Sequence, residues 1–409
     1  MSAAAIERVG MDASADPVRV TRIRIESVDV VRGVIMILMA LDHTRDYFGD
    51  VTASPTRLAT TTAALFFTRW ITHICAPVFA LLTGTGARLA LRRRGKAALS
   101  RFLLSRGLWL VFLELTVMRF LWQYNTDYKL TVLTVLWSLG WSMVLLAGLI
   151  WLPTWLIAAL GVTMIATHNL LDRVPPPTLT GMGAFGKLIA FLHSPGLTLS
   201  GEHTVFSAYV LVPWVAVPMV GYALGAIYEW DRERRRAFLL RLGLGLIALF
   251  IVLRAVNLYG DPLPWSGQRS GLFTLMSFIN ATKTPPSLLF LLMTLGPAML
   301  FLRAVDGGTP AFLRPAMIIG KVPLFYFIMH VVVLHTATVI SSLARYGTAR
   351  YMTESPTLDK FPVTQPPGWP ASLPVVYLIW IGVVLVLYPL CRWFAALKAR
   401  RNDAWLSYL

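Results

Sequence analysis

Charged residues and cysteines are both scarce in this sequence. Only 14% of its 409 residues are charged and 56% are hydrophobic, whereas soluble globular domains carry about 25% charged residues. This composition excludes an ordinary soluble protein. The two cysteines, Cys75 and Cys391, lie far apart in apolar stretches, so that they predict neither a disulfide framework nor a metal site.

The sequence also lacks the motifs of several enzyme classes. It has no phosphate-binding glycine loop followed by Lys-Ser or Lys-Thr, no Gly-x-Ser-x-Gly stretch and no paired-histidine metal motif. We therefore expect no bound metal. The N-terminal stretch mixes acids with bases and has no apolar core, so it is not a signal peptide.

Long apolar runs, in contrast, recur along the chain. About ten runs approach the twenty residues that a helix needs to cross about 30 Å of hydrocarbon. We predict an all-α, polytopic membrane bundle of about ten transmembrane helices over residues 28–392, between terminal tails at 1–27 and 393–409. The predicted spans are 28–48, 62–87, 106–124, 130–150, 153–171, 205–228, 238–258, 286–304, 316–341 and 371–392.

Positive charge is distributed unevenly over the loops. The chain has 37 Lys and Arg against 20 Asp and Glu, a net charge of +17, and the loop "ARLALRRRGKAALSRFLLSR" has no acid. With ten spans this loop lies on the same side as both termini, which is the cytoplasm by the positive-inside rule. Topology therefore explains the charge, and no nucleic-acid partner is expected. The two longest loops, about 172–204 and 346–370, are predicted to be extracytoplasmic.

The first predicted span, in "SVDVVRGVIMILMALDHTRDYF", is the most heavily charged. Asp29 lies one turn before Arg32, and His43 follows Arg32 by eleven residues, so that Arg32 and His43 share one helix face about 16 Å apart. Ionisable groups within a membrane usually face the protein interior and mark functional paths. A solvated helix exit is the alternative. It explains the final "DHTRD" but not Asp29 and Arg32.

An imidazole flanked by carboxylates is the usual arrangement of a general base, because the carboxylate orients the ring and stabilises its cation. His43 with Asp42 or Asp46 fits this pattern, and we predict these three residues to be catalytic. His73, at a comparable depth in the second span, is a further catalytic candidate. A core histidine held by hydrogen bonds is an equal alternative for His73.

Four stretches carry a family resemblance: "SVDVVRGVIMILMALDH", "THICAPVFALLTGTGARL", "NATKTPPSLLFLLMTLGP" and "GKVPLFYFIMHVVVLH". They resemble the heparan-alpha-glucosaminide N-acetyltransferase-like proteins of the transmembrane acyltransferase superfamily, in particular the bacterial branch. The resemblance implies acetyl-CoA or another acyl-CoA bound from the cytoplasm. It also implies transfer of the acyl group to a hydroxyl or amine of an extracytoplasmic glycan, localisation in a bacterial inner membrane, and a homodimer.

The resemblance has one departure that concerns the catalytic histidine. The spacing of Arg32 and His43 matches the hallmark of the related acyltransferase family three, whose histidine is taken to be catalytic. The lysosomal enzyme instead has its proposed catalytic histidine in the loop after this helix, where the present chain has "GDVTASPTRLATTT" and no histidine. As a family inference, the assignment of His43 therefore depends on the spacing in that related family, and another histidine of this chain is the alternative.

Coenzyme A has several phosphate charges, which the acid-free basic loop is suited to bind. Topology alone is the alternative explanation of that loop. Asp29, Lys283 and His330 are predicted to line a cavity, with interfacial snorkelling of Lys283 and a helix-to-helix hydrogen bond of His330 as alternatives. The predicted residues that bind coenzyme A are Arg32, Arg92, Arg93, Arg94, Lys96 and Arg101.

Two other function classes remain open at this stage. A proton-coupled transporter or flippase would use Asp42, His43 and Asp46 as a proton relay, although no inverted repeat is visible. A membrane sensor or partner protein without catalytic activity is the third class. It predicts that His43→Ala is tolerated and that no acyl transfer is lost.

Overall fold

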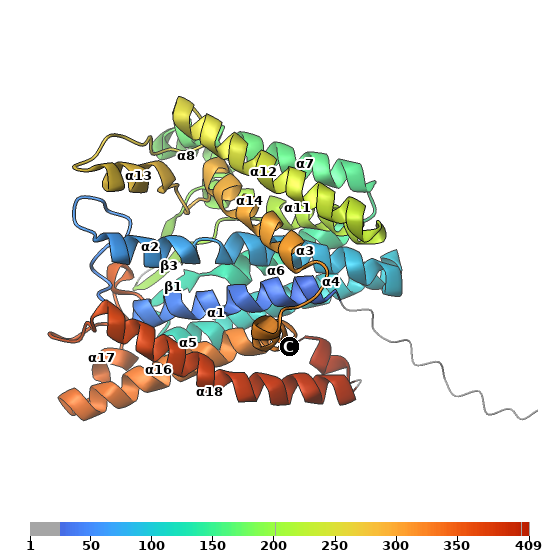
Figure 1. Ribbon diagram of the computed structural model, residues 1–409. Helices are drawn as coiled ribbons and strands as arrows, with labels where there is room; N and C mark the ends of the chain where they lie inside the picture. Colours follow the sequence, from blue (N-terminus) through green and yellow to red (C-terminus); the bar gives the residue numbers. More distant parts are fainter. Residues whose placement is uncertain (1–24, 201, 402, 409) are drawn as a thin grey trace, which may run out of the picture.

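The computed structural model describes residues 25–200, 202–401 and 403–408 as a mainly helical bundle with one small sheet (Figure 1). Helix α1 (Glu26–Phe48) lies near its centre, with α7 (Thr154–Thr167) and α12 (Arg232–Val256) along one edge and α16 (Pro323–Tyr346) and α18 (Leu373–Arg400) along the other. The predicted N-terminal tail, residues 1–27, falls almost entirely outside the described residues.

Seven described segments are long and apolar enough to cross a membrane, which supports an integral membrane protein. They coincide with seven of the ten predicted spans, so the count of ten is not confirmed. The seven are Ala63–Arg94, Thr154–Arg173, Leu211–Glu229, Arg232–Val256, Leu288–Val305, Pro323–Tyr346 and Leu373–Arg400.

The other three predicted spans differ in kind. The first is helix α1. Its charged residues lie toward both ends of the helix, and for this reason it is not among the seven apolar segments. Residues 106–124 continue through α4 (Lys96–Leu113), a π-helical turn (Glu114–Met118) and α5 (Arg119–Gln123). The span predicted at 130–150 is wrong at its start, because Leu130–Leu133 forms strand β1 before the 15-residue helix α6 (Val135–Leu149).

Strand β1 belongs to a three-stranded sheet with the order β1-β3-β2. It pairs in parallel with β3 (His203–Ser207), which pairs antiparallel with β2 (Leu197–Ser200). Val132 and Phe206 are register partners. The sheet thus joins the chain after α5 to the chain before α10, two segments that are far apart in sequence. It is a small addition to a mainly helical structure, which is consistent with the predicted all-α membrane bundle.

The remaining elements are short helices and the connections between the long ones. The two longest predicted loops contain helices of their own. The other bounds are α2 (Ala63–Thr72), α3 (Cys75–Arg94), α8 (Pro176–Gly181), α9 (Gly183–His193), α10 (Leu211–Trp214), α11 (Ala216–Leu224), α13 (Gly271–Ile279), α14 (Leu288–Val305), α15 (Arg314–Gly320) and α17 (Arg350–Thr353), with 3₁₀ turns at His168–Arg173, Gly225–Glu229, Ala311–Leu313, Leu358–Lys360 and Ala404–Ser407.

Helix α1 packs against α15 with almost no side chain between the two backbones. A Cβ atom added to Gly33 would lie 1.7 Å from the carbonyl oxygen of Ala316, and one added to Gly320 would lie 1.8 Å from that of Asp29. Small residues permit such close packing of membrane helices. The contact fixes the end of α15, and the next residue, Lys321, beside the first turns of α1.

Candidate active site

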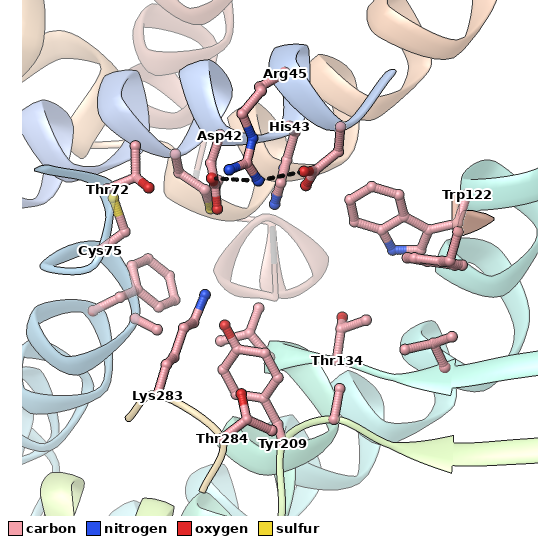
Figure 2. A pocket seen from close by; sticks show the side chains of 18 of the residues that line it. Asp42, His43, Arg45, Thr72, Cys75, Trp122, Thr134, Tyr209, Lys283 and Thr284 are labelled. Atoms are coloured by element: carbon pink, nitrogen blue, oxygen red, sulfur yellow. Dashed lines mark hydrogen bonds and ion pairs between the residues drawn. The ribbon is translucent and has the colours of Figure 1, made fainter. Parts of the chain in front are cut away.

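A cavity of about 380 Å³ lies beside the C-terminal half of α1. It is enclosed by α1, the break between α2 and α3, the sheet, the loop between α13 and α14, and α16. Figure 2 shows polar side chains from these elements around one space. We call it the His43 cavity. Its charged or titratable lining includes Asp42, His43, Arg45, Asp46, Arg69 and Lys283.

The two carboxylates of this cavity are paired with arginines. Asp42 contacts Arg69 through Oδ2, and its Oδ1 lies 3.2 Å from Nη2 of Arg45. Arg45 also contacts Asp46, so that its guanidinium lies between both carboxylates (Figure 2). The predicted orientation of His43 by Asp42 or Asp46 therefore has no counterpart among the described contacts, since these carboxylates hold Arg45 and Arg69 instead.

The ring of His43 is held by residues that come from distant parts of the chain. Its Nδ1 lies 2.6 Å from Nε2 of His330, and the two rings stack with centroids 4.9 Å apart. Trp122 meets the His43 ring edge-on, at a centroid distance of 5.0 Å. His330 is fully buried behind His43 and does not belong to the cavity lining.

Lys283 and Tyr209 form the opposite wall of the cavity. Figure 2 shows the amine of Lys283 and the hydroxyl of Tyr209 pointing toward Asp42 and His43, and Lys283 Nζ lies 5.8 Å from the centre of the Tyr209 ring. The loop that carries Lys283 lies outside the candidate spans. Burial and, to a smaller extent, the nearby Arg69 guanidinium together lower the pKa of the Lys283 amine to about 8.

The loop of Lys283 is fixed by one buried carboxylate. Asp261 accepts hydrogen bonds from the backbone N–H of Thr282 at 2.8 Å, from the Thr282 hydroxyl at 2.9 Å and from the Ser287 hydroxyl at 2.7 Å. This network holds the backbone on both sides of Lys283. The side chain is thereby presented to the cavity from an ordered loop.

His73, the second histidine predicted to be catalytic, lies at the break between α2 and α3. It is 3% exposed and packs against Phe290 of α14, with ring centroids 5.3 Å apart. It is not part of the His43 cavity lining. The neighbouring Cys75 does line the cavity.

A second cavity, of about 250 Å³, lies beside the N-terminal half of α1. We call it the Arg32 cavity. The described residues that line it include four basic side chains and no acidic one, and the rest is mostly apolar. Phe79 of α3 lines both cavities. The four basic residues are Arg32, Arg106, Lys321 and Lys398.

Of the residues predicted to bind coenzyme A, one lines the Arg32 cavity and the other five lie on the exposed surface. Arg32 lines the Arg32 cavity, bonded to Asp29 at 3.2 Å and to the Gly320 carbonyl at 3.4 Å. Asp29 itself supports Arg32 without lining either cavity. The other five lie on the exposed surface around the turn between α3 and α4. They are Arg92, Arg93, Arg94, Lys96 and Arg101.

Comparison with known families adds an independent line of argument. A family model described as the catalytic part of heparan-alpha-glucosaminide N-acetyltransferase matches residues 24–254, more than half of the chain. The chain belongs to this family. A search of curated proteins gave no match. Membership confirms the predicted family and indicates a transmembrane acetyltransferase, of a kind that uses acetyl-CoA as co-substrate.

The match to the heparan-alpha-glucosaminide N-acetyltransferase family includes all of α1 to α3 and the basic turn after them. It therefore covers His43, Arg69, Phe79 and Arg106. It ends within α12, before Lys283 and the residues of α15 to α18 that complete the two cavities.

Sequence reasoning missed several residues that line these cavities. Arg106 had a usable signal, because it is the last basic residue of the acid-free stretch and the first residue of a predicted span, and so lies deeper than its neighbours. Lys321 lies within one of the stretches that carry the family resemblance. Lys398, Tyr209 and Phe79 had no signal that distinguishes them from ordinary interfacial or packing residues.

Proposed function

We propose that this protein is a membrane-embedded acyltransferase. It moves an acyl group, with acetyl as the first candidate, from cytoplasmic acyl-CoA to a hydroxyl or amine of an extracytoplasmic glycan. One observation carries the proposal. Two cavities of different chemistry, one with four basic side chains and one with His43, share Phe79 as a common wall. In a chain of this family, such a pair suits a donor and an acceptor that approach from opposite sides.

The donor would bind in the Arg32 cavity. Guanidinium and ammonium groups form strong charge-assisted hydrogen bonds with phosphate oxygens, and the basic cavity suits the phosphates of coenzyme A. The exposed basic turn between α3 and α4 would raise the local concentration of the anionic donor. By the positive-inside rule this side of the bundle is the cytoplasmic one.

The reaction would take place in the His43 cavity, beyond Phe79. His43 removes a proton from the acceptor hydroxyl or amine as that atom attacks the thioester carbonyl carbon. The new bond to the acceptor forms, the carbon–sulfur bond breaks, and the imidazolium returns its proton to the leaving thiolate. A double displacement through an acyl-histidine is the alternative route.

Lys283 and Tyr209 would stabilise the negative charge that develops on the carbonyl oxygen. An ammonium group and a hydroxyl already held at the cavity wall can supply this stabilisation without reorganisation during the reaction. Asp42 and Asp46 would act through Arg45 and Arg69, which they hold in place. Simultaneous binding of donor and acceptor makes positioning a major part of the rate enhancement.

The acceptor and the setting are inferred from the family. A glucosaminide amine, as in the family's description, is the first acceptor to test. The bacterial inner membrane as location and a homodimer as assembly are proposed on the same basis. The transporter alternative is less well supported, because Asp42 is held by both Arg45 and Arg69, which favours its charged form and suits a proton relay poorly.

The test is release of coenzyme A from acetyl-CoA by the purified protein in detergent, together with thermal stabilisation by acetyl-CoA. An oligosaccharide with a terminal glucosaminide amine serves as the acceptor probe. Wild type is expected to be stabilised and to release coenzyme A, and His43→Ala to be stabilised without turnover. His203→Ala is the control, since His203 is exposed. Absence of both stabilisation and turnover in wild type would contradict the proposal.

A further inference from the structure

A chain of two histidines and one carbonyl group connects the His43 cavity with helix α16. His43 Nδ1 lies 2.6 Å from His330 Nε2, and His330 Nδ1 lies 3.1 Å from the carbonyl oxygen of Tyr326. His330 is 0% exposed. Within the described part of the chain its hydrogen-bond partners are His43 and the backbone carbonyl groups of Tyr326 and Phe327, and no carboxylate is among them.

The direction of each hydrogen bond follows from the last member of the chain. A carbonyl oxygen only accepts, so His330 Nδ1 must carry the proton and donate it to Tyr326. A neutral imidazole has one N–H, and His330 Nε2 is therefore an acceptor. His43 must then donate from Nδ1. In a neutral His43 the remaining nitrogen, Nε2, has a free lone pair.

Among the residues that the structure describes, no carboxylate bonds to the His43 ring in place of His330. Asp42 and Asp46 are bound to Arg45 and Arg69. The edge contact with Trp122 and the stacking on His330 restrict rotation of the ring. Because His43 lines the cavity and its Nδ1 faces His330, Nε2 is the nitrogen that remains to meet a reactant.

We propose that His330 is a positioning residue that fixes His43 in the tautomer with an unprotonated Nε2 toward the cavity. This inference rests on the proposed function, which makes that lone pair the base. When Nε2 takes the acceptor's proton, the Nδ1–H of the imidazolium still donates to His330 Nε2. A neutral imidazole thus performs the orienting task for which a carboxylate is more usual.

The experiment compares His330→Gln with His330→Leu. The Gln amide can present an oxygen near the former Nε2 and accept from His43, whereas Leu has a similar size and no acceptor. We expect His330→Leu to lower the rate of coenzyme A release by on the order of 100-fold, with unchanged thermal stabilisation by acetyl-CoA. His330→Gln should recover most of that loss. Equal losses in both variants, or no loss in either, would overturn the inference.

A second measurement does not depend on turnover. Nitrogen-15 NMR of histidine-labelled protein in detergent distinguishes protonated from unprotonated ring nitrogens, and His43→Gln identifies the His43 signals. The expected result is a protonated Nδ1 and an unprotonated Nε2 in wild type, altered in His330→Leu and kept in His330→Gln. The reverse tautomer in wild type would overturn the inference. Failure of wild type to bind or use acetyl-CoA would instead count against the proposed function.

Discussion

Asp42 is the residue on which the charge balance of the His43 cavity depends. It contacts both Arg45 and Arg69, and the Asp42 side chain is only 11% exposed. Removal of one member of a buried ion pair leaves an uncompensated charge in a low-dielectric site. The carboxylate is therefore expected to stabilise the fold as well as the cavity.

We predict that Asp42→Asn lowers the free energy of unfolding by about 3 kcal/mol, because Arg69 loses its carboxylate. Thermal unfolding in detergent measures the effect. Glu202→Gln is the control. The side chain of Glu202 is 84% exposed and lies 4.0 Å from Lys129, and exposed pairs contribute about 0–1 kcal/mol. Equal stability of the two variants would argue against a structural role of the Asp42 ion pairs.

Lys283 gives the cavity a pH dependence. Burial lowers the pKa of its amine to about 8, so that the ammonium form is present below that pH and is lost above it. We therefore expect the rate of acyl transfer to fall as the pH rises through about 8. In Lys283→Arg the guanidinium stays charged far above this range, and the alkaline decrease should move to higher pH. An unchanged alkaline limb in Lys283→Arg would exclude Lys283 as its source.

At the scale of elements, the contact between α1 and α15 determines how the Arg32 cavity is assembled. Gly33 and Gly320 allow the two backbones to touch. This places Lys321 near Arg32, whose guanidinium bonds to the Gly320 carbonyl. Any side chain at Gly33 would force α1 and α15 apart.

Gly33→Ala is accordingly expected to lower the melting temperature and to weaken the thermal stabilisation by acetyl-CoA. Gly148→Ala is a matched control within α6, because an added Cβ at Gly148 meets nothing within 4 Å. This control should leave both quantities unchanged or raise stability slightly, since Ala favours helix more than Gly does. Similar behaviour of the two variants would show that close packing of α1 and α15 is not required.

The elements themselves were predicted from sequence with uneven success. Long apolar runs are a strong signal, and seven of them are helices of spanning length. The strand Leu130–Leu133 is included in a predicted helix, because a short apolar run has no periodicity that distinguishes a strand from a helix. Its pairing with β3 depends on residues more than seventy positions away, which a single sequence does not reveal.

The site residues that lie on α1 could be predicted from the sequence, but their contacts with residues of other helices could not. The spacing of Arg32 and His43 indicated one face of α1, and each residue lines a cavity. The partner of His43, however, is His330, 287 positions further along the chain. Asp42 and Asp46 are neighbours of His43 in sequence, yet Arg45 and the distant Arg69 attract them more strongly than a neutral imidazole does.

At the scale of the whole molecule, the division into two cavities predicts which basic residues bind the donor. Arg106 lines the Arg32 cavity, whereas Arg92 is exposed at the surface. Arg106→Ala is expected to raise the Kd for acetyl-CoA about tenfold or more, because it removes a charge-assisted hydrogen bond to phosphate. Arg92→Ala should change it by less than about threefold. Binding measured by thermal shift or calorimetry decides between the two, and the opposite ranking would move the donor site to the exposed loop.

The central claim is transfer across the membrane from a donor on the basic side to an acceptor on the other. Its most direct test uses proteoliposomes in which radiolabelled acetyl-CoA and a glucosaminide oligosaccharide are confined to opposite sides. The orientation of the protein is read from protease access to the basic α3–α4 turn. We predict labelled oligosaccharide only when acetyl-CoA is on the side of that turn, and none with His43→Ala. Labelling that requires both reactants on the same side, or that persists in His43→Ala, would contradict the account.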